Sequence, residues 1–211
     1  MRTIIFANGA INSWTGIIDS IHPDDLIIAA DGGAKHCKAL GLHPHIAIGD
    51  FDSLNADELV SLAKGGTLII RFPERKDFTD LELAIQHACQ SGSNQLLIYG
   101  ALGSRWDQTL ANILLPAAYP NLSIILVDGA QEIFLITSQR PVVVSGKKGD
   151  TVSLIPIQGN AIGVCTTGLE YPLNNETLLF GASRGISNVL MAETAQVSLT
   201  NGMLLCAMIH L

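Results

Sequence analysis

The sequence predicts an α/β N-terminal domain with a mostly parallel sheet and flanking helices, followed by a smaller all-β sandwich domain. Short apolar runs alternate with segments of helical pattern in the first part of the chain, which is typical of strands joined by helical crossovers. Each run is nearly all apolar, as expected for strands covered by helices on both faces. After Asp128-Gly129 the helical pattern stops, and strand-like runs follow one another between turn residues.

The elements of the N-terminal domain follow from this alternation. The runs that predict strands are Thr3–Ala7, Leu26–Ala30, Ile46–Ile48, Thr67–Ile70, Gln95–Tyr99 and Leu122–Val127. The segments that predict helices are Asn12–Ser20, Gly33–Leu40, Asn55–Ala63, Thr79–Ser91 and Asp107–Ala117. Thr79 and Glu82 have the spacing of a capping box, which indicates a helix start at that point.

The elements of the C-terminal domain are strand-like runs between turns. They are Glu132–Thr137, Pro141–Ser145, Thr151–Ile155, Ala161–Cys165, Thr177–Phe180, Ala195–Thr200 and Met203–Ile209. Asn201-Gly202 lies between the last two runs, a pattern that favours a β-hairpin. We place the domain boundary at the change of pattern, giving residues 1–129 to the α/β domain and 130–211 to the β-sandwich.

Composition excludes several classes of protein. The chain has 211 residues, 48% hydrophobic and 15% charged, so it can bury a large core. Lys plus Arg is 12 and Asp plus Glu is 19, which gives a net charge of −7 and argues against nucleic-acid binding. No apolar run approaches the roughly 18–20 residues of a membrane-spanning helix, so no membrane partner is expected. The four cysteines are scattered, which predicts reduced thiols in a cytoplasmic protein.

Chemically active residue types follow successive predicted strands. An open parallel sheet binds its ligands at the carboxyl ends of its strands, so these segments are expected to meet at one edge. The segments are Asp31-Gly32-Gly33-Ala34, Gly49-Asp50-Phe51-Asp52-Ser53, Arg71 to Asp80, and Gly100 to Asp107.

The aspartates in these segments indicate a metal site. Asp50 and Asp52 are two residues apart, and close carboxylates repel unless a cation or proton lies between them. Oxygen ligands suit Mg²⁺, which commonly binds one or two carboxylates together with substrate phosphates. Asp77 and Asp80 arrive from the next segment. The alternative is that Asp52 or Ser53 only caps the following helix.

The remaining residues of these segments indicate phosphate binding. Gly32 and Gly33 would let a ligand approach the backbone at a helix start, although a plain tight turn would use them as well. Lys76 and Arg105 are among few cations and could bind phosphate, or could form surface ion pairs with neighbouring carboxylates. Neither the G-x-G-x-x-G fingerprint nor a P-loop is present, which disfavours nicotinamide dehydrogenases and Walker-type ATPases.

Taken together, these motifs resemble those of the thiamine pyrophosphokinase family. The matching segments are Ala30 to Ala34, Ile48 to Ser53, Lys76 to Asp80, Gly103 to Gln108, Thr166 to Leu173, and Gly185 to Asn188. They cover both domains in order, and the pair G-D-x-D-S and K-D-x-T-D is the most specific part. Glu170 and Val189 depart from residues common in the family.

The resemblance implies a homodimer that transfers diphosphate from ATP to the hydroxyl of thiamine and releases AMP. It implies that the α/β domain binds ATP and Mg²⁺, and that thiamine lies at the subunit interface against the β domain. The expected metal ligands are Asp50, Asp52 and Asp80. The residues expected around phosphate and substrate are Asp31, Gly32, Gly33, Lys76, Asp77, Arg105 and Asp107. Those expected around thiamine are Thr167, Tyr171, Ser187 and Asn188.

The residues leave two points of the chemistry open. Either Asp77 or Asp107 could orient or deprotonate the attacking hydroxyl. The acceptor could instead be another alcohol, such as a hydroxymethylpterin. A non-catalytic sensor of thiamine or nucleotide is the alternative outside enzymes, and the presence of the metal-binding carboxylates argues against it.

Overall fold

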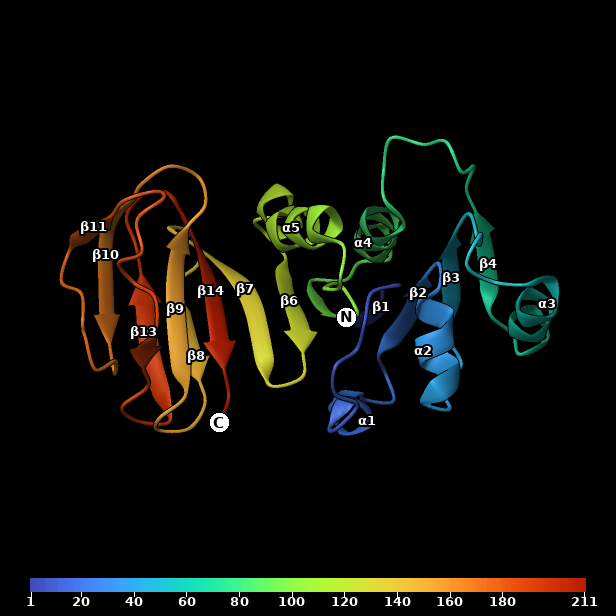
Figure 1. Ribbon diagram of the computed structural model, residues 1–211, viewed down its shortest axis with the longest axis horizontal. Helices are drawn as coiled ribbons and strands as arrows, with labels where there is room; N and C mark the ends of the chain where they lie inside the picture. Colours follow the sequence, from blue (N-terminus) through green and yellow to red (C-terminus); the bar gives the residue numbers. More distant parts are fainter. The chain divides into compact units, whose positions relative to one another are not determined.

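The computed structural model describes the whole chain, Met1 to Leu211, and contains two compact units (Figure 1). The first unit comprises Met1–Leu115 and Asn121–Gly129, and the second comprises Pro116–Pro120 and Ala130–Leu211. The predicted fold class, a mostly parallel α/β part followed by an all-β part, is confirmed. None of the helices has both the length and the apolar character needed to span a membrane.

The first unit is built on a parallel sheet with strand order β6-β5-β1-β2-β3-β4. Its strands are β1 (Arg2–Phe6), β2 (Leu26–Ala30), β3 (Ile46–Gly49), β4 (Leu68–Arg71), β5 (Gln95–Tyr99) and β6 (Ser123–Asp128). Its helices are α1 (Ile17–Ser20), α2 (Gly33–Ala39), α3 (Ala56–Lys64), α4 (Asp80–Gln90) and α5 (Trp106–Leu114). A short 3₁₀ helix, η1 (Leu115–Ala118), continues from α5.

Helices cover both faces of this sheet, which explains why its central strands are almost wholly apolar. Side chains alternate along β1, so that Ile4 and Phe6 face one side and Ile5 faces the other. Ile4 and Phe6 share a buried cluster with residues of α1 and α2, including Ile17 and Cys37. Helix α4 contacts β1, β2 and β3, but none of its buried residues belongs to that cluster, so α4 covers the opposite face.

The second unit consists of two antiparallel sheets around one core. One has the strand order β12-β9-β14-β7 and the other β11-β10-β13-β8. The strands are β7 (Gln131–Thr137), β8 (Val142–Ser145), β9 (Thr151–Pro156), β10 (Ala161–Thr167), β11 (Glu176–Leu178), β12 (Asn188–Val189), β13 (Thr194–Ser198) and β14 (Met203–Ile209). Buried residues of both sheets, such as Leu154, Val164, Val197 and Leu204, form a single cluster. This arrangement is the predicted sandwich.

The predicted hairpin at Asn201-Gly202 is wrong. β13 pairs with β8 and β10, whereas β14 pairs with β7 and β9, so the turn carries the chain from one sheet to the other. The Ile162 amide donates to the Asn201 carbonyl at 2.9 Å, and this bond ties the turn to β10. Gly202 has a φ of 97°, and a Cβ there would lie 2.6 Å from the Asn160 carbonyl oxygen. The Asn-Gly pair therefore serves a tight crossing between the sheets.

Helix starts differ in detail from the predictions. At Thr79 only half of the predicted capping box forms, with the Glu82 amide donating to the Thr79 hydroxyl at 3.2 Å. A complete capping box lies instead at the start of α3, where Asn55 and Glu58 exchange bonds of 2.9 and 3.0 Å. Of the helix predicted over Asn12–Ser20, only the last turn forms, as α1, because Gly16 at its N-cap is left-handed with a φ of 77°.

A glycine brings the start of α2 against β1. A Cβ on Gly33 would lie 1.9 Å from the backbone oxygen of Phe6, a distance at which the backbone itself must move. Gly33→Ala should therefore lower the free energy of unfolding by about 3 kcal/mol or more, as overpacking of a rigid interior does. Urea denaturation measures this loss.

Gly103→Ala is the matched control for Gly33→Ala. A Cβ on Gly103 would meet its nearest atom, the amide nitrogen of Ala10, at an ordinary 3.5 Å. Its free energy of unfolding should change by less than about 0.5 kcal/mol. Equal stability of the two variants would contradict the packing role of Gly33.

Candidate active site

A cavity of about 850 Å³ lies at the carboxyl ends of β1 to β5 in the first unit. This volume is within the range of roughly 300–1,000 Å³ found for small-molecule sites. The predicted site residues that line it are Asp31, Asp50, Asp52, Lys76, Asp80, Arg105 and Asp107. The loops that follow successive strands therefore converge in space, as expected for an open parallel sheet.

Three carboxylates meet on one wall of the cavity. Asp31, Asp50 and Asp52 each offer an oxygen, and these oxygens lie within 4.8 Å of one another. Asp31 is only 5% exposed, and its Oδ1 is buried without a hydrogen-bond partner. A buried carboxylate oxygen without a donor is destabilising unless a cation completes it. The donor set, oxygen atoms only, fits a hard divalent cation such as Mg²⁺.

A strained turn holds two of these carboxylates apart and in place. Phe51, between Asp50 and Asp52, has a φ of 63°, which is rare for a bulky residue. Its ring is 4% exposed and packs in the core beneath the sheet edge. The Arg71 guanidinium lies 5.4 Å from the centre of that ring and donates to the Asp50 carbonyl at 3.3 Å. Core burial on one side and Arg71 on the other thus fix the turn.

Lys76 lies between two of the site's carboxylates. Its Nζ donates to Asp50 Oδ2 at 2.9 Å and lies 3.1 Å from Asp80 Oδ1, with a side chain only 12% exposed. The contact with Asp80 is an ion pair without the alignment of a hydrogen bond, since Asp80 Oδ1 has no hydrogen-bond partner. Lys76 is therefore the chain's own counter-ion at the site.

The environments of Asp50 and Asp80 push their pKa values in opposite directions. The hydrogen bond from Lys76 holds the pKa of Asp50 below its ordinary value. Burial raises the pKa of Asp80, and this effect outweighs the favourable charge of Lys76. For Lys76 itself, burial alone would lower the pKa, but the two neighbouring carboxylates, Asp50 and Asp80, raise it overall. Lys76 is charged at neutral pH, and Asp50 is the more readily ionised of its partners.

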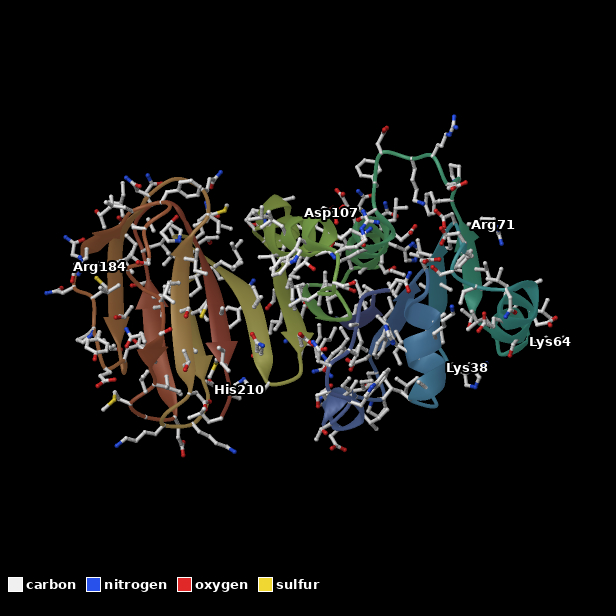
Figure 2. The ribbon with its side chains drawn as sticks, in the orientation of Figure 1. Lys38, Lys64, Arg71, Asp107, Arg184 and His210 are labelled. Atoms are coloured by element: carbon white, nitrogen blue, oxygen red, sulfur yellow. The ribbon has the colours of Figure 1, made fainter.

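Arg105 and Asp107 form a second, more open ion pair (Figure 2 labels Asp107 at the start of α5). The Arg105 guanidinium donates twice to the Asp107 carboxylate, at 2.5 and 3.2 Å, and lowers the pKa of Asp107. Both side chains are about two-thirds exposed, at 67% and 66%. An ion pair this exposed is screened by water and contributes little to stability. Arg105 can therefore exchange Asp107 for an incoming phosphate.

Other predicted residues of the first unit lie outside the cavity lining. Gly32 and Gly33 do not line it, and each is needed for packing: a Cβ on Gly32 would lie 2.0 Å from the Asn8 side-chain oxygen. Asp77 is exposed and likewise absent from the lining. Of the two carboxylates considered as a base, only Asp107 lines the cavity.

In the second unit, the structure brings Tyr171 and Asn188 together. Asn188 is 7% exposed, and its side-chain amide makes two hydrogen bonds to the Tyr171 backbone. It accepts from the Tyr171 nitrogen at 3.1 Å and donates to the Tyr171 oxygen at 2.8 Å. The Tyr171 side chain itself is 65% exposed. Ser187 has a φ of 57° and donates its amide to Ser153 at 3.0 Å. Thr167 ends β10 with an exposed side chain.

Asn8 and Ser53 are among the residues of the cavity wall to which the sequence assigned no binding role. Asn8 follows β1, and both residues hydrogen-bond to Asp31 Oδ2, at 3.0 Å from Asn8 and 2.5 Å from Ser53. The rule that draws attention to strand ends applies equally to β1, the strand between β5 and β2, and would have pointed to Asn8. Ser53 belongs to the G-D-x-D-S motif, but the one individual role considered for it, capping the next helix, is filled by Asn55 at the start of α3.

The chain is similar to known proteins over nearly its whole length. The family described as "Thiamin pyrophosphokinase, catalytic domain" matches residues 18–126, and "Thiamin pyrophosphokinase, vitamin B1 binding domain" matches residues 137–204. The thiamine pyrophosphokinase of Bacillus subtilis is 29% identical over 208 residues, which cover 97% of each chain. Thiamine pyrophosphokinase 1 of Arabidopsis thaliana is 30% identical over 196 residues, covering 82% of this chain and 73% of the plant protein.

Solved structures give the same result. The crystal structure of the Bacillus subtilis enzyme superposes with a TM-score of 0.89 at 27% identity, covering 100% of this chain and 99% of that one. That of Geobacillus thermodenitrificans thiamin pyrophosphokinase gives a TM-score of 0.88 at 25% identity, covering 99% and 97%. The match thus includes both compact units and the loops that form the cavity. The chain belongs to the thiamine pyrophosphokinase family.

Proposed function

We propose that this protein is a thiamine diphosphokinase, which transfers diphosphate from ATP to the hydroxyl of thiamine and releases AMP. The observation that carries the proposal is the cavity at the strand ends, where a cluster of carboxylates, Lys76 and Arg105 meet in a chain of this family. The reaction forms a bond between the thiamine oxygen and the β-phosphorus, and breaks the bond from that phosphorus to the oxygen of the α-phosphate. Such transfers need mainly positioning and charge neutralisation.

The carboxylate wall supports Mg²⁺ as the cofactor. Asp50 and Asp52 would hold it, and the grouping of their oxygens with that of Asp31 adds Asp31 to the ligands expected from the sequence. Asp80 stays a predicted ligand, and in the structure it faces Lys76. When bound, Mg²⁺ would neutralise charge on the phosphate oxygens.

The cations and the remaining carboxylate divide the other tasks. Arg105 would bind phosphate with its two donor groups, and Lys76 would add fixed positive charge beside the transferred group. Asp107 is better placed than Asp77 to orient or accept the hydroxyl proton, because Asp107 lines the cavity. In the second unit, Asn188 would hold the Tyr171 backbone so that the tyrosine ring can contact the cationic thiazolium of thiamine. Thr167 and Ser187 would also contact thiamine, as the resemblance implies.

The homodimer, with its active site at the subunit interface, rests on the family resemblance. The proposed cytoplasmic location rests on the four scattered cysteines, which are free. The assignment of residues 1–129 to ATP and metal binding and of 130–211 to thiamine binding and dimerisation is part of the same proposal. The two matching family domains support this division of labour.

Release of AMP from ATP and Mg²⁺ tests the function directly. We expect AMP release to require thiamine, and Asp50→Asn to lower turnover by about a thousandfold, since it removes a charge that holds the cation at the reacting phosphates. Asp57→Asn, an exposed carboxylate in the first turn of α3, is the control and should keep wild-type turnover. AMP release with a hydroxymethylpterin but not with thiamine would establish the alternative diphosphokinase. Absence of release with either alcohol would refute the enzyme assignment.

Lys76 should determine the lowest pH at which the site still binds a metal ion. Its ammonium favours the ionised forms of Asp50 and Asp80, so Lys76→Met should raise the pKa of both carboxyls. Protons then compete with the metal at higher pH, and Mn²⁺ binding followed against pH should fail at higher pH than in the wild type. Arg75→Met removes an exposed neighbouring cation outside the cavity lining, and Mn²⁺ binding by this variant should fail at the same pH as in the wild type. A shift to lower pH for Lys76→Met would contradict the counter-ion role.

Tyr171 should contribute to thiamine affinity alone. Tyr171→Ala removes an aromatic face worth about 1–2 kcal/mol to a cation, so KM for thiamine should rise about tenfold while KM for ATP stays constant. Phe180→Ala, in the same unit and similarly exposed at 62%, is the matched control and should change neither KM. Equal effects of the two variants would remove Tyr171 from the thiamine site.

A further inference from the structure

Asn8, in the loop after β1, is bonded to the buried carboxylate of the site. Its side-chain nitrogen donates to Asp31 Oδ2 at 3.0 Å and to the Ser53 hydroxyl at 2.9 Å. Ser53 in turn donates to the same Asp31 oxygen at 2.5 Å. Two donors from different strand ends therefore converge on one oxygen of Asp31.

The two oxygens of Asp31 therefore have different surroundings. Oδ2 has its hydrogen bonds from Asn8 and Ser53, whereas Oδ1 is buried and has none. Asp31 also offers an oxygen to the group it forms with Asp50 and Asp52. With Oδ2 occupied by donors, Oδ1 is the oxygen left for a cation.

The orientation of the Asn8 amide follows from the chemistry of its partner. An ionised carboxylate can only accept hydrogen bonds, so Asn8 must turn its nitrogen toward Asp31. Its oxygen then points to Gly32, where a Cβ would lie only 2.0 Å away. Gly32 thus leaves the space that the Asn8 amide fills, and the amide is confined between Gly32 on one side and Asp31 with Ser53 on the other.

We infer that Asn8 is a positioning residue for the divalent cation: together with Ser53 it holds Oδ2 of Asp31, so that Oδ1 is directed at the metal. The inference rests on the metal site of the proposed function. Hydrogen-bond partners that orient a ligating carboxylate commonly change metal affinity by about 10–100-fold. Asn8 has this role although it is exposed in the wall of the cavity and lies in a loop of its own.

The test measures Mn²⁺ binding by electron paramagnetic resonance on the full chain, in the presence of α,β-methylene-ATP, which cannot undergo the transfer. Asn8→Ala should weaken Mn²⁺ binding about tenfold. Asn8→Leu, which removes both donated bonds but keeps a similar volume, should do the same. Asn12→Ala is the matched control, because Asn12 donates to Asp128 at 2.7 Å from the same loop but outside the cavity lining. It should bind Mn²⁺ within twofold of the wild type.

A double variant separates positioning from direct contact with substrate. In an Asp31→Asn background, Asn8→Ala should weaken Mn²⁺ binding by less than a further twofold, because its partner is already changed. In turnover, Asn8→Ala should raise the Mg²⁺ concentration for half-maximal rate while kcat at saturating Mg²⁺ stays near the wild-type value.

Unchanged Mn²⁺ affinity in both Asn8 variants would overturn the inference, as would a loss of kcat that saturating Mg²⁺ does not restore. Failure of the wild type to bind Mn²⁺ would overturn it together with the metal site. If the wild type binds Mn²⁺ and the Asn8 variants bind it weakly, but no alcohol supports AMP release, the inference stands and the proposed reaction fails.

Discussion

The site depends on a single constraint, the repulsion among carboxylates that a parallel sheet brings to one edge. Asp31 follows β2, Asp50 and Asp52 follow β3, and Asp80 begins α4 after β4. Carboxylates in such proximity destabilise one another unless a cation or a proton intervenes. Lys76 supplies one positive charge between Asp50 and Asp80. The negative charge that Lys76 does not balance is the charge that the proposed Mg²⁺ would neutralise.

The geometry of the carboxylates is stabilised by the core rather than by the loops alone. Asp31 and Phe51 both have left-handed backbone, with φ values of 47° and 63°. Such conformations cost of order 1–3 kcal/mol each. Burial of a phenylalanine ring contributes about 1.5–3 kcal/mol, the same order as the strain at its own position. The packing of Phe51 beneath the sheet edge can therefore hold Asp50 and Asp52 in a strained turn, which an isolated loop would not adopt.

The sequence predicted the parts of this arrangement that depend on regular patterns. Apolar runs located the strands of the first unit, and the strand-end rule located Asp31, Asp50, Asp52, Lys76 and Arg105 in one cavity. What it could not predict were contacts between loops distant in the chain. The amide of Asn8 reaches Asp31 and Ser53 across separations of 23 and 45 residues, and Asn201-Gly202 joins two sheets instead of two paired strands. Both features depend on tertiary packing, which local turn propensity does not predict.

The two cations of the site differ in a way that bears on how an acidic chain handles polyphosphate. Lys76 is 12% exposed and contacts two carboxylates, so moving it would leave partly buried charges unpaired. Arg105 is 67% exposed and contacts one carboxylate that water can solvate as well. An arriving phosphate could therefore recruit Arg105 at little cost, whereas Lys76 stays between its two carboxylates as fixed positive charge. The net charge of −7 is thus compatible with the proposed use of ATP, because the acidic wall would bind the cation that accompanies the phosphates and Arg105 would meet the phosphates themselves.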